Sequence, residues 1–259
     1  MEKITVQVPA TSANCGPGFD SLGLALELYN IFTFTPDETA TVNKYTFSGF
    51  DAETLAKEDQ SQNLVGQAMG AVFQKANTEP VYGLIHSETV IPPSRGLGSS
   101  STAIVAGLLL ANRLLSKPLT AHDLLVLAND IEGHPDNVAP ALLGNLVCAV
   151  NHPNELLYTT VALPEELLFA VVVPEVSVST EYARSVLPKM IAHKEAVANV
   201  SHATLFVTAL LQHKLDCLRI ALEDYLHVPY RKTLIPHCDE VFNAAPALRA
   251  ALNLSLIHI

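Results

Sequence analysis

The sequence of 259 residues predicts a mixed α/β protein, because segments with strand periodicity and segments with helix periodicity alternate along the chain. Apolar and polar residues alternate, or β-branched and aromatic residues gather, over residues 3–8, 29–34 and 83–90, which predicts three strands. Residues 63–75 and 99–115 carry apolar side chains at helical spacing. At about 100–200 residues per domain, this length makes one large domain or two small ones.

A bend between two helical pieces is predicted in the middle of the chain. Thr120 is a typical N-cap for a helix over residues 121–131. Gly133 and Pro135 then interrupt the helical pattern, and apolar spacing resumes over residues 138–143. We therefore expect the polar residues between the two pieces to lie at the bend.

The second half opens with a continuous apolar run, residues 167–173, which predicts a strand. Helical spacing follows over residues 180–187, 194–212 and 214–225. The sequence contains no repeat, low-complexity tract or flexible linker, so we expect the two halves to pack closely.

The chain is acidic, with 15 Lys and Arg residues against 26 Asp and Glu residues and a formal net charge of −11. This balance offers no general attraction to nucleic acid or to anionic lipid, so neither is an expected partner. The longest uncharged apolar stretch, residues 103–111, is well short of the ~20 residues that span a membrane. The first residues lead directly into a strand without a basic and apolar signal segment, so a cytoplasmic protein is expected.

Cysteine and histidine spacing predicts no zinc site. Cys15, Cys148, Cys217 and Cys238 form no C-x-x-C pair, and the ten histidines show no H-x(3–5)-H spacing. We expect the thiols to be buried and free.

The most informative segment, P-P-S-R-G-L-G-S-S-S-T, lies at residues 92–102 after a predicted strand and before a predicted helix. Gly96 and Gly98 let the backbone turn closely around an anion, and the helix that follows would present free N–H groups and its positive dipole end. The segment is not a Walker A loop, because Ser99 stands where that motif needs Lys, nor does it match G-x-G-x-x-G. It predicts a phosphate cradle, with an ordinary Gly/Ser helix cap as the alternative.

Two further polar segments carry candidate ligands. Residues 9–20 (P-A-T-S-A-N-C-G-P-G-F-D) include Asn14 and Asp20, an amide and a carboxylate that could hold a hydroxyl or an ammonium group. Residues 131–140 (I-E-G-H-P-D-N-V-A-P) place two carboxylates, an imidazole and an amide at the predicted bend. A carboxylate near a phosphate cradle is a natural ligand for Mg²⁺. Taken singly, the first segment could simply be a turn, and for the second a surface loop would be the better interpretation.

Together the three segments resemble the three motifs of the amino-terminal domain of the GHMP kinases, which are kinases of small molecules. The P-A-T-S-A-N-C-G-P-G-F-D and H-P-D-N-V-A-P stretches are most similar to those of the homoserine kinases within that family. Residues 179–188 (S-T-E-Y-A-R-S-V-L-P) resemble the S-T-x-x-A-R-x-x-L-P segment of these kinases, and residues 230–236 (Y-R-K-T-L-I-P) resemble their R-x-x-L-I-P segment.

The resemblance implies the two-domain GHMP kinase fold. A ribosomal-protein-S5-like, ATP-binding domain would cover residues 1–155, and a ferredoxin-like carboxyl-terminal domain would begin at residue 156 and run to residue 259. A third glycine-rich family motif has no counterpart after Pro236, and residues 254–259 read as a translated sequencing adapter. We therefore expect a carboxyl-terminally truncated chain; an apolar terminal strand is the alternative. Family members are commonly homodimers.

The resemblance also implies an activity, the transfer of the γ-phosphoryl group of Mg²⁺·ATP to L-homoserine. The product would be O-phospho-L-homoserine, in threonine biosynthesis. Ser99, Ser100 and Glu132 would position Mg²⁺, and Asn63, which is equally a helix N-cap, matches a residue near the adenine. The implied ATP-binding residues are Asn63, Pro92, Pro93, Ser94, Arg95, Gly96, Leu97, Gly98, Ser99, Ser100, Ser101 and Thr102.

For the amino acid, Arg184 and Arg231 match a carboxylate clamp, a role that suits the bidentate guanidinium. The implied substrate-binding residues are Asn14, Asp20, His134, Asp136, Asn137, Thr180, Arg184 and Arg231. The implied catalytic residues are Glu132, Asn137 and Ser100. An amide cannot serve as a base, so catalysis would rest on positioning and electrostatics, with His134 as an alternative proton acceptor. Another GHMP small-molecule kinase and a non-catalytic ligand-binding member are the alternative functions.

Overall fold

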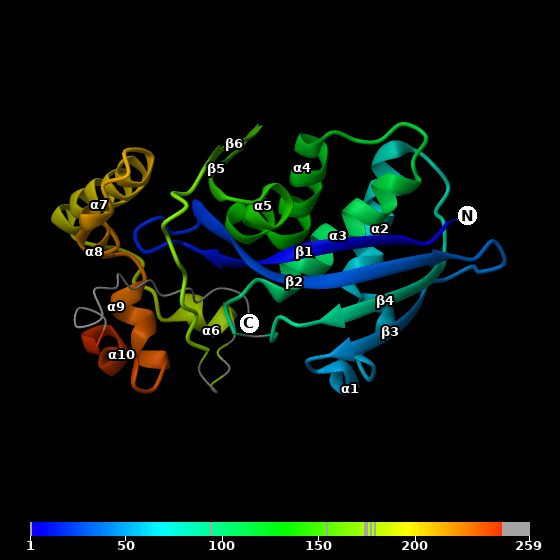
Figure 1. Cartoon of the computed structure of the whole chain (residues 1–259), viewed down its shortest axis with the longest axis horizontal. Coiled ribbons are helices and arrows are strands. Elements are labelled where there is room, and N and C mark those ends of the chain that lie inside the picture. Colours follow the sequence, from blue (N-terminus) through cyan, green and yellow to red (C-terminus); the bar gives the residue numbers. More distant parts are fainter. Residues whose placement is uncertain are drawn as a thin grey trace.

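The computed structural model describes residues 2–93, 95–153, 155–173, 176, 178 and 180–244. Within them, one six-stranded sheet carries helices on one face and a group of further helices at one end (Figure 1). The strands are β1 (Ile4–Ala13), β2 (Leu22–Pro36), β3 (Lys44–Gly49), β4 (Gly83–Thr89), β5 (Leu146–His152) and β6 (Glu155–Val161). The helices are α1 (Ala52–Leu55), α2 (Leu64–Ala76), α3 (Ser99–Leu114), α4 (Ala121–Glu132), α5 (Pro135–Leu143), α6 (Thr180–Ser185), α7 (His193–Leu211), α8 (Leu218–Ala221), α9 (Val228–Arg231) and α10 (Cys238–Ala244).

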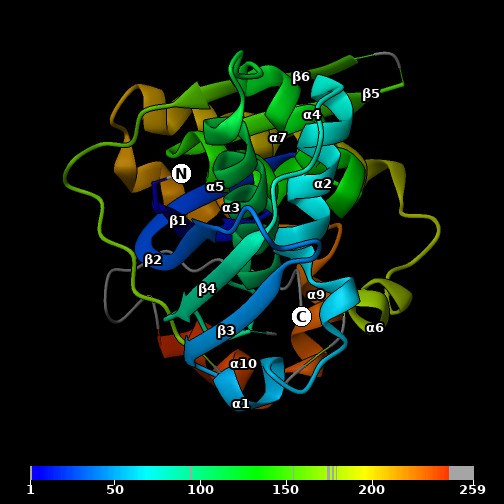
Figure 2. The same cartoon turned by 90° about the vertical axis from the view of Figure 1, so that its right-hand side faces the viewer.

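The long strand β2 organises the sheet. It pairs antiparallel with β1 along one edge, while its other edge pairs antiparallel with β4 near its carboxyl end and with β5 near its amino end. Strand β3 lies parallel to β4 and β6 antiparallel to β5. The short helix α1 packs beside β3 (Figure 2).

A bulge in the β1–β2 ladder prepares the place of the predicted cradle. Three residues of β2 oppose the single Ala10 of β1, which bends the pair locally. Leu26 and Leu28 from this bulge pack with Ala10, Ile91 and Leu97 in a small buried cluster. The segment that leads from β4 into α3 is thereby anchored on an apolar base.

Helices α2 to α5 cover one face of the sheet and enclose the main core (Figure 1). Helix α3 crosses the core, and α2 approaches it closely: a Cβ on Gly107 would lie 2.3 Å from the carbonyl oxygen of Val65. The predicted N-cap of α4 is confirmed, since the side chains and backbone of Thr120 and Asp123 form a reciprocal capping box.

The predicted helix break is confirmed as well. Helix α4 ends at Glu132, Gly133 adopts a left-handed conformation with φ 92°, and α5 begins at Pro135. Proline is favoured at this first helical position because its missing N–H would have no partner there. The polar residues between the two helices are thus fixed at a sharp corner.

The strand predicted over residues 167–173 is wrong. These residues form no strand in the structure, and the side chains of residues 168–173 are exposed, 93% for Leu168 and 68% for Val172. An apolar run becomes a strand only where another strand satisfies its backbone groups, and none of the described residues pairs with this run. The single helix predicted over residues 214–225 is only partly right, because a 3-10 turn and the short α8 take its place.

The helices after residue 180 dock at the end of the sheet opposite the amino terminus (Figure 1). Phe206 and Leu210 of α7 pack with Leu218 of α8 against Leu22 and Cys15, at the start of β2 and in the loop before it. This cluster holds the loop between β1 and β2 against the carboxyl-terminal helices. The division into domains at residues 155 and 156 stays a prediction, and β6 extends the sheet to Val161. Among the described residues, no helix combines the length and apolarity that a membrane crossing requires.

Candidate active site

The segment between β4 and α3 has the backbone form that the cradle prediction requires. Gly96 and Gly98 are left-handed, with φ 71° and φ 67°. The carbonyl oxygen of Leu97 accepts a hydrogen bond from the N–H of Thr11 (3.0 Å). Gly98 is the N-cap of α3 and supplies no side-chain cap, so the first-turn N–H groups have no side-chain acceptor from that position. Ser94, part of the prediction, lies outside the described residues.

Two side chains lie directly beneath Gly98. A Cβ at this position would approach Thr11 Oγ1 to 2.0 Å and Asn137 Oδ1 to 3.2 Å, so only glycine fits. Thr11 Oγ1 donates a hydrogen bond to Asn137 Oδ1 (2.7 Å), and both residues are fully buried. The predicted catalytic amide is therefore in contact with the base of the cradle.

Asn30 is a structural residue of this site that sequence reasoning missed. Its Oδ1 accepts hydrogen bonds from the N–H groups of Val90 (2.8 Å) and Ile91 (2.9 Å), and its Nδ2 donates to Thr102 Oγ1 (3.0 Å). The buried amide thus joins both ends of the cradle to β2. The sequence feature that could have indicated this role is an isolated Asn in a strand of apolar and aromatic residues.

Glu132, at the end of α4, faces the start of α3. Its Oε1 accepts hydrogen bonds from Ser101 Oγ (3.0 Å) and Ser100 Oγ (3.5 Å). Burial raises the pKa of Glu132, although the Ser101 bond opposes this shift. The structure therefore brings Ser100 to Glu132 as predicted and adds Ser101, whereas the contact it records for Ser99 is a carbonyl accepting from Thr102 Oγ1.

The corner between α4 and α5 carries an imidazole–carboxylate pair. His134 Nδ1 lies 2.6 Å from Asp136 Oδ1. Burial disfavours a charge on His134, but the hydrogen bond and the negative charge of Asp136 prevail and raise its pKa. Asp136 Oδ2 and Asn137 Nδ2 are both buried, with no hydrogen-bond partner among the described residues. Such atoms are costly in a folded protein unless a ligand or water satisfies them.

The loop between β1 and β2 brings further polar groups to the same place. Asn14 and Asp20 are left-handed, and Asn14 Oδ1 accepts a hydrogen bond from the N–H of Asp20 (3.1 Å). Asn14 Nδ2 is buried with no hydrogen-bond partner in the described part of the chain. Burial, helped by the charge of Asp136, raises the pKa of Cys15 to about 12, so this thiol stays neutral beside the loop.

Two guanidinium groups converge on this loop. Arg184 donates a bidentate pair of hydrogen bonds to the Asp20 carboxylate (2.8 and 3.1 Å), and Nε of the fully buried Arg231 donates to the carbonyl oxygen of Ala183 (3.0 Å). Both groups lie over the ring of Phe19, at 5.6 Å and 5.1 Å from its centroid. Burial and the charge of Arg184 lower the pKa of Arg231 to about 10, which leaves it charged at neutral pH.

The carboxyl-terminal helices hold the same loop from behind. Asn199 Nδ2 donates to the carbonyl oxygen of Pro17 (2.8 Å), and His227 Nε2 lies 2.9 Å from the carbonyl oxygen of Gly16. A Cβ on Gly16 would lie 2.6 Å from the carbonyl oxygen of Leu222. The loop is therefore set by both halves of the chain.

His227 makes folding stability depend on pH. Burial lowers its pKa, against the opposing charge of Asp224. On acidification, His227 therefore takes up a proton in the unfolded chain before it does so in the folded protein. Its contribution to the free energy of unfolding is fully present above about pH 6.5 and falls below that by at most ~1.4 kcal/mol per pH unit. We expect the free energy of unfolding of His227→Gln, from urea denaturation, to change less between pH 7 and pH 5 than that of the parent. The exposed control His193→Gln should keep the parental slope, and an unchanged slope in His227→Gln would contradict this assignment.

The recorded side-chain contacts of Asn63 are those of a helix cap, and Thr180 is described only in its backbone. Asn63 caps α2, because its Oδ1 accepts from the N–H of Val65 (3.1 Å). This confirms the N-cap reading, and a contact with adenine stays a prediction. Thr180 begins α6, and its side chain lies outside what the structure describes. The other predicted substrate-binding residues lie in the loop between β1 and β2, at the corner between α4 and α5, and in α6 and α9. They are Asn14, Asp20, His134, Asp136, Asn137, Arg184 and Arg231.

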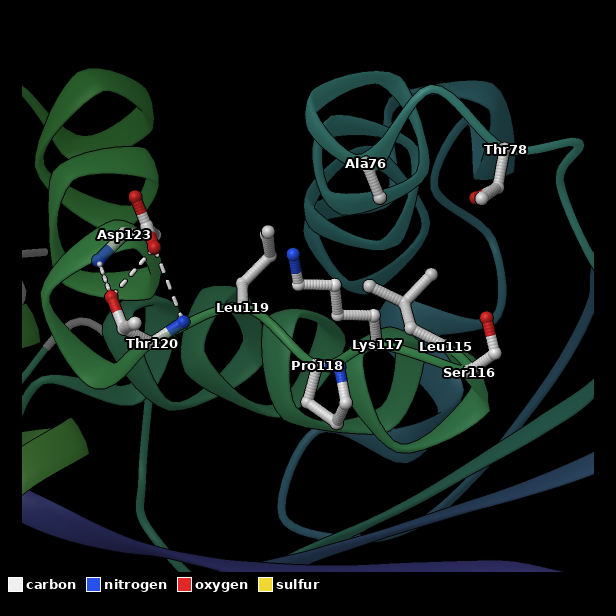
Figure 3. A pocket seen from close by; sticks show the side chains of 9 residues that line it. All are labelled: Ala76, Thr78, Leu115, Ser116, Lys117, Pro118, Leu119, Thr120 and Asp123. Carbon is white, nitrogen blue, oxygen red and sulfur yellow. Dashed lines mark hydrogen bonds between the residues drawn. The ribbon is translucent and has the colours of Figure 1, made fainter.

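A surface cavity of about 480 Å³ lies away from this site (Figure 3). It opens at the carboxyl ends of α2 and α3 and at the start of α4, where Figure 3 shows the Thr120–Asp123 capping interactions. The cradle lies at the opposite end of α3, so this cavity contains none of the predicted site residues.

Known proteins resemble this chain over nearly its whole length. The family model described as the GHMP kinases N terminal domain matches residues 63–145. A homoserine kinase of Clostridium beijerinckii is 46% identical over 249 residues, covering 95% of this chain and 80% of the relative. A homoserine kinase of Caldicellulosiruptor saccharolyticus is 43% identical over 240 residues, covering 93% of this chain and 76% of the relative.

Solved structures with a similar fold also include homoserine kinases. The crystal structure of homoserine kinase from Cytophaga hutchinsonii superposes with a TM-score of 0.86 at 28% sequence identity, covering 98% of this chain and 83% of that one. The expected GHMP kinase fold is thereby confirmed. On the identity and coverage of its relatives, this chain belongs to the homoserine kinases of the GHMP kinase family.

Proposed function

We propose that this chain transfers the γ-phosphoryl group of ATP to the hydroxyl group of L-homoserine and releases O-phospho-L-homoserine and ADP. The relatives that share 40–46% of its sequence are homoserine kinases. One observation supports the proposal most. Among the described residues, Asn14 Nδ2, Asp136 Oδ2 and Asn137 Nδ2 are buried without partners, and all three belong to the set predicted to bind homoserine.

The chemistry of these groups suits a small zwitterion that carries a hydroxyl group. A carboxylate of the substrate would take donors from Arg231 and from the N–H groups of Arg184 that its pair with Asp20 does not use. The open oxygen of Asp136 suits the ammonium group, while the amide N–H groups of Asn14 and Asn137 suit oxygen acceptors. A neutral sugar needs no paired guanidinium groups, and these favour homoserine over a sugar among the alternatives.

The nucleotide phosphates would lie against the glycine turns of the cradle and the start of α3, where backbone N–H groups favour anions. Glu132, with the Ser100 and Ser101 hydroxyls, fits Mg²⁺, since this ion is commonly held by one or two carboxylates together with substrate phosphates. When bound, Mg²⁺ neutralises charge on the transferring phosphates.

Asn137 would act by positioning and not as a base, because an amide accepts no proton at neutral pH. The raised pKa of His134 keeps its imidazole more protonated at neutral pH than a free histidine, which disfavours it as the proton acceptor. Rate acceleration would then come from fixed donors around the transferring group.

ADP release, measured with the purified full chain and a panel of acceptors, tests the proposal. We expect turnover with L-homoserine and not with mevalonate, galactose or water alone. Turnover with mevalonate or galactose would favour another GHMP kinase, and ATP binding without turnover would favour a non-catalytic member. We further propose a role in threonine biosynthesis, a cytoplasmic location and a homodimer, as the family resemblance implies.

A further inference from the structure

The contact between Thr11 and Asn137 anchors one end of a buried amide and leaves its other end free. A primary amide has an acceptor oxygen and a donor nitrogen of similar size, so packing alone does not distinguish its two orientations. Here Thr11 Oγ1 donates to Asn137 Oδ1 (2.7 Å), while Asn137 Nδ2 is buried with no partner among the described residues. In this arrangement the Thr11 hydroxyl group bonds to the oxygen end of the amide, and the nitrogen end stays open.

Thr11 is itself held firmly. Its N–H donates to the carbonyl oxygen of Leu97 (3.0 Å), one residue before Gly98, whose missing side chain makes room for Oγ1. Thr11 lies next to the bulge of β1, where it is paired with Ala25 of β2 and its N–H also bonds to the cradle. The hydroxyl group is therefore fixed with respect to both the cradle and α5.

We propose that Thr11 is a positioning residue for phosphoryl transfer, because it holds the Asn137 amide with Nδ2 directed to donate to an oxygen of the reacting groups. That oxygen belongs to the acceptor hydroxyl group or to the transferring phosphoryl group, both of which are hydrogen-bond acceptors. The proposal rests on the proposed function, since it concerns the same reaction. Without the Thr11 hydroxyl group the amide loses its anchor, so it can turn and its Nδ2 is no longer held toward that oxygen.

The isosteric variant Thr11→Val tests this role. We expect kcat for L-homoserine to fall by about 10- to 100-fold, while the KM values for ATP and homoserine change by less than about 3-fold. Thr11→Ser keeps the donor and should retain kcat within about 3-fold of the parent. The matched control is Thr5→Val, in the same strand, where Thr5 makes an exposed hydroxyl contact with Thr33 (3.1 Å); its kcat should not change.

A double-mutant cycle separates this role from a general loss of structure. If Thr11 acts through the amide, adding Thr11→Val to Asn137→Ala should lower kcat no further than Asn137→Ala alone. Three results would overturn the proposal. They are additive losses of kcat in the double mutant, an unchanged kcat in Thr11→Val, and a kcat of Thr11→Ser as low as that expected for Thr11→Val. The Thr11→Ser result decides the matter even if thermal unfolding shows that Thr11→Val does not fold. Absence of homoserine turnover in the parent would instead refute the proposed function, and this inference with it.

Discussion

Replacing Glu132 by glutamine is expected to lower kcat for homoserine by ~100-fold or more and to raise the Mg²⁺ concentration that gives half the maximal rate. Glutamine keeps the size of the side chain and an acceptor oxygen for the Ser101 hydroxyl, so the packing between α3 and α4 should survive. What is lost is the negative charge opposite the cradle. Steady-state rates over a magnesium titration give both quantities.

The neighbouring Asp130 offers a matched control. It lies in the same helix, its side chain is exposed, and Asp130→Asn removes the same charge without touching the cradle. We expect its magnesium titration to superimpose on that of the parent. A Glu132→Gln variant with the parental magnesium titration would remove Glu132 from the proposed metal site.

Replacing Arg231 by lysine is expected to raise the KM for L-homoserine by ~100-fold, with a change in the KM for ATP of less than about 3-fold. Lysine keeps a positive charge in this fully buried position but loses the planar fork that pairs with a carboxylate. It also loses the Nε donor to the carbonyl oxygen of Ala183, which costs ~1–3 kcal/mol of stability. Thermal unfolding of the variant shows how much of the effect is structural.

The control for this experiment is Arg219→Lys, an exposed arginine in α8 that is not among the residues proposed to bind homoserine. Both KM values should stay at their parental levels. Equal increases in the two KM values of Arg231→Lys would place Arg231 outside the carboxylate clamp.

Local features of the fold were predictable where the residues that produce them lie within one short segment. The helix break needs only Gly133 and Pro135, and the turn before α3 needs only Gly96 and Gly98. In contrast, residues 167–173 were predicted as a strand from composition alone, and a strand also requires a partner that composition does not supply. Strands β3 and β6 were missed because few of their side chains are buried, which leaves a weak pattern. Strand β5 was missed although its first residues are buried, because its apolar run follows that of α5 after only two residues.

The candidate site was predictable in its members and not in its contacts. The motifs supplied Asp20 and Arg184, but their ion pair joins residues 164 positions apart. The bond between Thr11 and Asn137 spans 126 positions, and both depend on how the sheet and helices fold around them. For the same reason, Asn30 was not predicted. Its hydrogen-bond partners Val90 and Thr102 are 60 and 72 positions away along the chain.

The proposed homoserine site has a determinant that lies away from the ligand, in the helices that hold the loop between β1 and β2. The loop bears Asn14 and Asp20, yet Asn199 of α7 and His227 beside α9 hold its backbone from the other side. The measured dissociation constant is therefore the intrinsic one divided by the fraction of molecules in which these helices are docked. Weakening the Asn199 anchor lowers that fraction and so weakens binding without removing any group that meets the ligand. The carboxyl-terminal helices would thus act on the proposed site twice, through Arg184 and Arg231 and through the fraction of molecules in which the loop is held in place.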